Sequence, residues 1–184
     1  NTTGLVLFGK NSAALRTLSA MLREHGVRKC YQTIVIGSLR EELHLIGKLH
    51  KDPEENKSRV YDAGDPRGKP IETIVRPVHT GSDYSLVDVE LVTGRSHQIR
   101  AHLQSAGYPL ICDTKYGWAS ANRALQKKIN WSTQLLHAGR LEIVQAPPPL
   151  EHLNGLEIKT PVPPFWKEIQ LALFNKEIIG NGIE

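Results

Sequence analysis

Many short apolar stretches of strand length and a few helical patterns lie along the chain. The first stretch, residues 4–8, reads G-L-V-L-F and predicts a strand. Asn11 or Ser12 can then cap a helix that ends at Gly26, because both side chains accept hydrogen bonds from free helix N–H groups. Residues 29–37 follow with the β-branched and aromatic content of a strand. We expect one face of the helix to carry Leu15, Leu18, Met21 and Leu22.

Charged residues and turn formers dominate residues 41–70. Lysines and arginines mix there with aspartates and glutamates. The pattern predicts a long hairpin-like excursion with a mobile, basic tip. An ordinary solvated surface loop is an equally good interpretation, because long loops are either functional or merely flexible. The residues that add turns are Pro53, Gly64, Pro66 and Gly68.

Strands predominate in the second half of the chain. Residues 71–78 and 84–91 predict successive strands, and Ser96 can cap a short helix that ends near Gly107. A second helix is predicted over residues 120–130. The remaining predicted elements are strands at 137–144 and 156–158 and a final helix that starts at Pro163 and Pro164 and carries Trp166, Ile169 and Leu173. Strands outnumber helices and mostly follow one another directly, which favours one α+β domain with a mixed, mostly antiparallel sheet flanked by helices.

Composition and charge narrow the class of protein. A chain of 184 residues with 40% hydrophobic and 23% charged residues suits one globular domain. No apolar run approaches the ~20 residues that span a bilayer, and no signal peptide is visible. Cys30 and Cys112 belong to no metal or disulfide pattern, so we expect a cytoplasmic protein. The net charge of +4 suits a polyanion such as RNA but equally suits a mildly basic enzyme.

The densest group of polar residues is the segment V-T-G-R-S-H-Q-I-R-A-H at 92–102, where a strand gives way to a helix. The free N–H groups at such a helix start attract anions. On that helix His97, Arg100 and Gln104 share one face, while Ile99 and Leu103 turn toward the core. Arg100 is well placed to pair with a buried carboxylate, and a purely structural ion pair is an equally good interpretation.

Other chemistries have little support in the sequence. His97 and His102 are five residues apart with no carboxylate at ligand spacing, so no metal site is predicted. No G-x-S-x-G, P-loop or G-x-G-x-x-G motif occurs, and neither cysteine has the context of a nucleophile. The sequence therefore predicts no nucleotide cofactor, and it contains no recognisable nucleophile of its own.

Residues 92–117, V-T-G-R-S-H-Q-I-R-A-H-L-Q-S-A-G-Y-P-L-I-C-D-T-K-Y-G, closely resemble the signature of the RluA-type pseudouridine synthases. Lys29-Cys30-Tyr31 with Gly37 resembles the K-x-Y segment of that family, and residues 135–138 resemble its L-L-H-A strand. Residues 1–5 resemble the end of its H-R-L-D-x-x-T-S-G-L motif. That match puts the family's nucleophilic aspartate two residues before Asn1. We therefore expect residues 1–184 to be a single catalytic domain that lacks its N-terminal part and is inactive alone.

The resemblance implies an isomerase that converts specific uridines of structured RNA, most of all large-subunit ribosomal RNA but also transfer RNA, into pseudouridine. It implies the pseudouridine-synthase fold, and no metal or organic cofactor. Arg100 matches the arginine that pairs with the nucleophile, and Tyr31 matches the tyrosine that stacks on the flipped base. An inactive RNA-binding module on the same fold is the alternative, and a monomer is the simplest expectation in either case. The residues expected to contact RNA are Arg95, His97, Gln98, Lys48, Lys51, Lys57 and Arg59.

Overall fold

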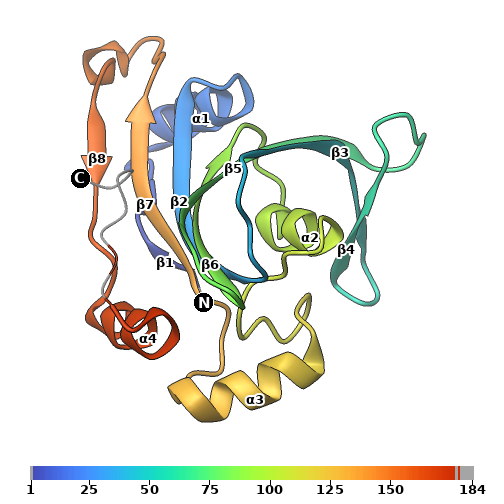
Figure 1. The fold of residues 1–184 in the computed structure, drawn as a ribbon. Helices are drawn as coiled ribbons and strands as arrows, with labels where there is room; N and C mark the ends of the chain where they lie inside the picture. The colour runs from blue at the N-terminus through green and yellow to red at the C-terminus, as the bar shows by residue number, and fades with distance from the viewer. Residues whose placement is uncertain (1, 177, 179–184) are drawn as a thin grey trace.

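A curved sheet organises the chain (Figure 1). The computed structural model describes residues 2–176 and 178, and within them seven strands run in the order β1-β7-β2-β6-β5-β3-β4, while β8 pairs with β7. All neighbouring strands are antiparallel except β1 and β7, which are parallel. The strands are β1 (Thr3–Gly4), β2 (Val27–Ile36), β3 (Leu43–Asp52), β4 (Lys57–Tyr61), β5 (Lys69–Thr80), β6 (Tyr84–Leu91), β7 (Leu136–Ile143) and β8 (Glu157–Lys159).

Both faces of the sheet are covered, as the alternation of β2 shows. Val35 belongs to the apolar cluster that includes Ile99 and Leu103 of helix α2, whereas its neighbour Ile34 belongs to the cluster with Leu125 and Trp166 of helices α3 and α4. Successive strand residues point to opposite faces, so one strand feeds two cores. The helices are α1 (Ser12–Arg23), α2 (Gln98–Ser105), α3 (Ala119–Ile129) and α4 (Pro164–Phe174).

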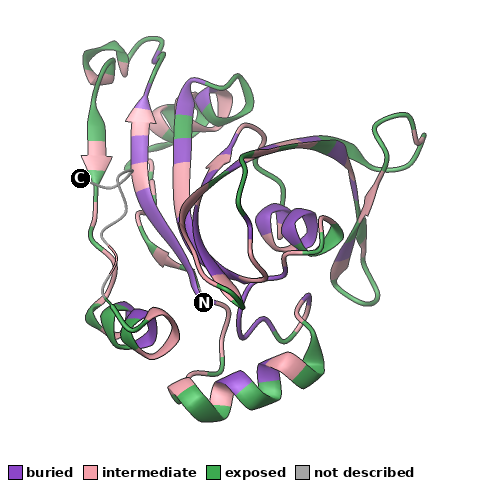
Figure 2. Ribbon diagram, in the orientation of Figure 1, coloured by how far each residue is buried: buried purple, intermediate pink, exposed green. Residues whose placement is uncertain are grey.

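Helix α2 lies inside the curve formed by β5, β3 and β4 (Figure 1). Ala101 of α2 packs in one cluster with Leu49 of β3, Ile71 of β5 and Tyr116, which follows α2. In Figure 2 most of α2 is buried, while α3 and the far ends of β3 and β4 are largely exposed. The segment that starts at Gln98 is therefore held from several sides, which suits a helix that positions functional side chains.

Most of the predicted elements are confirmed. The α+β class and the mixed, mostly antiparallel sheet are as expected. The predicted cap of α1 is Asn11, whose Oδ1 accepts a hydrogen bond from the Ala14 N–H at 2.8 Å. The predicted hairpin is β3 and β4, which pair from Lys48 with Tyr61 to Asp52 with Lys57. The mobility of its tip stays a prediction.

Two local predictions are wrong. Of the strand predicted over residues 4–8, only Gly4 lies in a strand, β1 (Thr3–Gly4), and Val6 and Phe8 are 69% and 82% exposed. The second error concerns Ser96, which does not cap α2. Leu15 and Leu22 of α1 are exposed, at 57% and 37%, so only part of the apolar face of this helix is buried.

The residue at the start of α2 is His97, in the left-handed conformation with φ of 60° and no side-chain cap. Ser96 loses the capping position because residues 95–98 form a tight turn, in which the Gln98 N–H donates to the Arg95 carbonyl oxygen at 3.1 Å. Within the part of the chain that the structure describes, no helix combines the length and the apolar character needed to cross a membrane.

Candidate functional site

A cavity of about 670 Å³ lies where the N-terminal segment, β2, β7 and the start of α2 meet. Five of the side chains predicted for catalysis or RNA contact line it together with Thr2 and Thr3. The five are Tyr31, Arg95, His97, Gln98 and Arg100. The fold therefore brings together residues from three sequence segments that are up to 98 positions apart, from Thr2 to Arg100, as a catalytic cavity requires.

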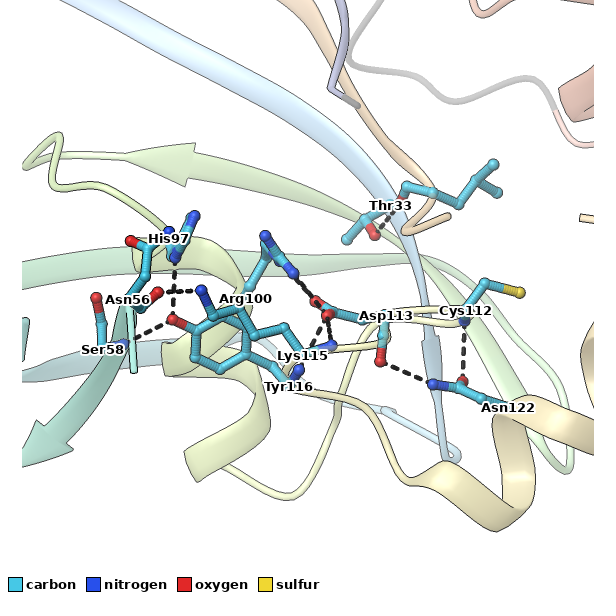
Figure 3. Close-up of polar contacts among 11 residues, drawn as sticks. Thr33, Asn56, Ser58, His97, Arg100, Cys112, Asp113, Lys115, Tyr116 and Asn122 are labelled. Carbon is cyan, nitrogen blue, oxygen red and sulfur yellow. Dashed lines mark hydrogen bonds and ion pairs between the residues drawn. The ribbon is translucent and has the colours of Figure 1, made fainter. Parts of the chain in front are cut away.

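Arg100 forms the central ion pair of this region, and its partner within the chain is Asp113 (Figure 3). Arg100 Nε donates to Asp113 Oδ2 and Nη2 donates to Oδ1, each at 2.7 Å. The arginine side chain is 12% exposed and the aspartate is fully buried. The prediction that Arg100 pairs with a buried carboxylate is confirmed, and the carboxylate is one that the sequence reasoning did not single out.

The charge of Asp113 is stabilised on several sides. Burial alone raises the pKa of this carboxyl, but the Arg100 guanidinium and the backbone N–H groups of Tyr116 and Lys115 lower the pKa below its usual value overall. Both N–H groups donate to Oδ1 at 2.9 Å. Asp113 therefore stays ionised at neutral pH and fixes the plane of the Arg100 guanidinium.

Asn122 of α3 holds Asp113 in position through two hydrogen bonds. Asn122 Oδ1 accepts a hydrogen bond from the Cys112 N–H at 3.0 Å, and Asn122 Nδ2 donates to the Asp113 carbonyl oxygen at 2.8 Å (Figure 3). Gly117 allows this approach, because a Cβ there would lie 2.4 Å from both Asn122 Nδ2 and the Asp113 carbonyl oxygen. The segment after α2 is thus shaped to present one carboxylate to Arg100.

Arg100 retains hydrogen-bonding capacity after it has bound Asp113. A guanidinium carries five N–H donors in a planar fork. Among the described residues its Nη1 forms no hydrogen bond. The guanidinium carbon also lies 4.9 Å from the centre of the Tyr116 ring, so the cation rests on an aromatic face. Arg100 can therefore bind a second anion in the cavity while it stays paired with Asp113.

Tyr116 links this centre to the β3–β4 hairpin. Its Oη accepts a hydrogen bond from the Ser58 N–H of β4 at 2.8 Å and lies 3.1 Å from His97 Nδ1 (Figure 3). The Lys115 ammonium donates to the carbonyl oxygen of Asn56, in the turn of the same hairpin. Residues 115 and 116 thus hold the hairpin against the start of α2, a connection that sequence spacing does not reveal.

His97 lines the cavity, whereas His102 is buried against Thr73 of β5. Burial lowers the pKa of His97, and the nearby charges of Arg100 and Lys115 lower it further, so the ring is neutral at pH 7. His102 is 3% exposed, its Nδ1 lies 3.0 Å from Thr73 Oγ1, and burial lowers its pKa to about 4. Among the described residues no group of three or more His, Cys, Asp or Glu side chains is placed to hold a metal ion.

The side chain of Gln98 is occupied by hydrogen bonds within the chain. Its Nε2 donates to the Glu72 carbonyl oxygen and to Thr73 Oγ1, and its Oε1 accepts from Thr93 Oγ1 and the Arg95 N–H, at 2.9–3.0 Å. The side chain is 1% exposed. A direct contact with RNA would have to break these bonds, so the RNA contact of Gln98 stays a prediction that this geometry does not favour. Its observed role is to shape the loop before α2.

Tyr31 lies on β2 at an irregularity of the sheet. The register between β2 and β7 shifts at Cys30/Tyr31, and such bulges re-aim the side chains beside them. Tyr31 is half-buried and lines the cavity. Burial raises the pKa of its phenol, and the Cys30 thiol raises it further, so the ring stays neutral. The aromatic face is thus available to a flat, uncharged partner.

The cations of the hairpin that are predicted to contact RNA differ in their contacts with other residues of the chain. Lys48 donates to the Asp65 carbonyl oxygen, and Arg59 pairs with Glu55 at 3.4 Å. Lys57 Nζ lies 5.7 Å from the centre of the Tyr116 ring. Lys51 forms no hydrogen bond or ion pair with any described residue. Lys51 is therefore the hairpin cation of this set that is most free to meet an external anion.

Comparison with known proteins gives the family. Residues 1–105 match the family described as RNA pseudouridylate synthase. The chain is 36% identical over 144 residues to an uncharacterized RNA pseudouridine synthase of Chloroflexus aurantiacus, covering 78% of this chain and 43% of that protein. It is 32% identical over 138 residues to the ribosomal large subunit pseudouridine synthase C of Buchnera aphidicola, covering 75% of this chain and 44% of that protein. The chain therefore spans less than half the length of these curated relatives.

A solved structure shows the same fold. The structure of human RNA Pseudouridylate Synthase Domain Containing 1 aligns with a TM-score of 0.69 and 23% sequence identity. The alignment covers 93% of this chain and 67% of that one. The expected fold is thus confirmed.

Proposed function

The chain belongs to the RNA pseudouridylate synthase family, and on that premise we propose that it forms the catalytic core of an enzyme that isomerises specific uridines of structured RNA to pseudouridine. The RluA type of the signature and the curated relative named for the large ribosomal subunit favour large-subunit ribosomal RNA as the substrate. Transfer RNA is the second candidate.

One observation carries the proposal. The cavity is lined by residues from three segments that resemble family motifs: Thr2 and Thr3, Tyr31, and Arg100. These segments lie far apart in the sequence, and the fold brings them to one cavity. Attack on a flipped nucleotide requires an aromatic face, a cation with a free N–H group and a nucleophile close to both.

The reaction breaks the C1′–N1 bond of uridine and forms a C1′–C5 bond, after which C5 loses its proton and N1 gains one. No atom is gained or lost overall. The nucleophile that we propose is the aspartate that the family motif puts two residues before Asn1. Asn1 lies outside the described residues, whereas Thr2 and Thr3 line the cavity. This supports a nucleophile at the cavity rim.

Arg100 and Tyr31 have separate proposed roles. A guanidinium beside the aspartate keeps the carboxylate ionised at neutral pH, as a nucleophile must be. Arg100 can do so through Nη1 while Nε and Nη2 remain on Asp113. Tyr31 offers an uncharged ring on which a flipped uracil can stack and turn. Neither role needs a metal or an organic cofactor.

The test is a search for new pseudouridines in large-subunit ribosomal RNA. Transcripts are incubated with the chain extended by the preceding residues that carry the motif, and with the chain alone. Pseudouridines are mapped by carbodiimide labelling and primer extension. We expect one or a few new sites with the extended protein. RNA binding without any new site would instead support the inactive RNA-binding module, and turnover by the unextended chain would refute the proposed nucleophile.

A further inference from the structure

A second cavity, of about 490 Å³, adjoins the first. Its lining comes from the paired parts of β3 and β4, the start of β5 and residues 95–96. Arg95 lines both cavities, so the two are neighbours across one side chain. The motif that resembles the family signature therefore faces two hollows, only one of which the proposed reaction uses.

The second cavity is surrounded by positive charge. Lys51, Lys69 and Arg95 line it, and none of the described lining residues is acidic. The side chains of Lys51, Lys69 and Arg95 form no hydrogen bond or ion pair with described residues. Three uncompensated cations around one hollow repel one another, and an anion placed among them removes that repulsion.

Neighbouring cations on the same hairpin behave differently. Arg67, two residues before Lys69, pairs with Asp65 at 2.7 Å, and Arg59 pairs with Glu55 at 3.4 Å. Carboxylates are thus within reach of this part of the chain, yet they neutralise the cations outside the cavity. The cations that line the cavity thus differ from Arg59 and Arg67, which carboxylates neutralise.

The walls of this cavity are fixed by the chain. The Ser58 N–H donates to Tyr116 Oη at 2.8 Å, and Ser58 Oγ donates to the Ser96 carbonyl oxygen at 3.4 Å, so β4 is attached to the loop before α2. Gly68 has a φ of +81°, and a Cβ there would lie 2.7 Å from the Leu49 carbonyl carbon. Only glycine allows this close packing without strain, so the hollow is a built feature.

We propose that the second cavity binds the phosphodiester backbone of the RNA strand directly next to the nucleotide whose base enters the first cavity. Lys51, Lys69 and Arg95 neutralise its phosphates, and Arg95 at the shared wall sets the distance between the bound strand and the target base. The inference rests on the proposed function and assigns to RNA one residue, Lys69, that is not among the cations predicted from the sequence to contact RNA.

Salt-dependent RNA binding tests this assignment without any need for turnover. The chain is titrated into a short, fluorescently labelled single-stranded RNA at KCl concentrations from about 50 mM to about 300 mM, and the dissociation constant is obtained from anisotropy. The variant is Lys51→Gln with Lys69→Gln. The matched control is Lys127→Gln with Lys128→Gln, which removes two exposed lysines of α3 that line neither cavity.

The two lysines should count as two phosphate contacts. Each contact with a single strand contributes about 0.7 to the slope of log K against log salt, so the double variant should reduce that slope by about 1.4 and weaken binding about 25-fold at about 0.1 M salt. The control should change neither by more than about a third of that amount. Both variants remove exposed side chains that form no hydrogen bond or ion pair with the described residues, so both should fold.

Each outcome is decisive. Equal slopes for the cavity variant and the control, with RNA still bound tightly, would overturn the second-cavity assignment and leave the proposed function standing. Failure of the unaltered chain to bind RNA at any salt concentration would overturn both. A reduced slope for the cavity variant alone supports the assignment.

Discussion

Arg100 and Asp113 form a buried, two-pronged ion pair in which Nε donates to Oδ2 and Nη2 donates to Oδ1, each at 2.7 Å. The aspartate is fully buried, and two backbone N–H groups donate to it as well. The pair therefore does two things: it anchors the loop after α2 to that helix, and it fixes the orientation of a guanidinium that lines the cavity.

The anchoring role predicts a large loss of stability in Asp113→Asn. Removing one partner of a buried ion pair leaves the other charge uncompensated, which costs about 3–5 kcal/mol. Glu142→Gln is the control, because Glu142 pairs with Arg28 at 2.6 Å but both side chains are partly exposed, and such pairs contribute about 1 kcal/mol or less. Urea denaturation of both variants measures the difference. Equal losses would show that the Arg100 pair contributes no more than a surface pair.

His102 predicts a loss of stability in mild acid. Its pKa is lowered from 6.5 to about 4, so His102 becomes protonated near pH 6.5 in the unfolded chain but only near pH 4 in the folded chain. Neutral His102 makes its full contribution to the free energy of unfolding above pH 6.5. This contribution is lost as the pH falls toward 4, and about 2 kcal/mol has been lost by about pH 5. Asp113 acts at lower pH, because its pKa lies below 3.8.

The measurement is the free energy of unfolding at about pH 7 and about pH 5. His102→Gln cannot titrate, so it should lose about 2 kcal/mol less than the unaltered chain between these two values. His152→Gln, which removes an exposed histidine, should behave like the unaltered chain. A pH dependence unchanged by His102→Gln would contradict the assignment of a buried, neutral ring.

Tyr116→Phe should loosen the hairpin from the site. The substitution removes the oxygen that accepts the buried Ser58 N–H, and an unsatisfied buried donor costs about 1–3 kcal/mol. Hydrogen exchange should therefore accelerate at Ser58, and in the chain extended by the preceding motif residues the KM for RNA should rise more than kcat falls. Tyr108→Phe is the matched control, because the Tyr108 hydroxyl has no hydrogen-bond partner among the described residues. Unchanged protection of Ser58 would mean that Tyr116 does not hold the hairpin.

The sequence predicted the fold better than it predicted the site. The β-branched and aromatic content of β2, the strand-length runs of β5 and β6 and the Asn11 cap follow from local rules, so these elements lie where expected. Asp113 and Tyr116 were missed as functional residues because their partners Arg100 and Ser58 are 13 and 58 positions away, and no local period records such contacts. Ser96 failed as a cap for a related reason: the buried Gln98 amide organises that turn through contacts with β5.

The same limit applies to the RNA-contacting cations. Lys48, Lys51 and Arg59 are all cations of the same hairpin, and the sequence does not distinguish them. In the structure, Lys48 donates to a carbonyl oxygen and Arg59 pairs with a carboxylate, and of the three only Lys51 lines the second cavity. Which lysine is free depends on the register of β3 against β4 and β5. A pattern of charges cannot give that register.

The central claim is that Arg100 acts in uridine isomerisation as well as in the ion pair. Arg100→Gln with Asp113→Asn separates these roles, because it replaces the ion pair by two neutral, hydrogen-bonding side chains and leaves no buried charge uncompensated. The chain extended by the preceding motif residues is compared with this double variant by single-turnover tritium release from RNA labelled at uridine C5. We predict release by the unaltered protein, and at least ~100-fold slower release by a variant that is folded and binds RNA with similar affinity. Release by the variant at the unaltered rate would contradict the claim and leave Arg100 as a structural residue only.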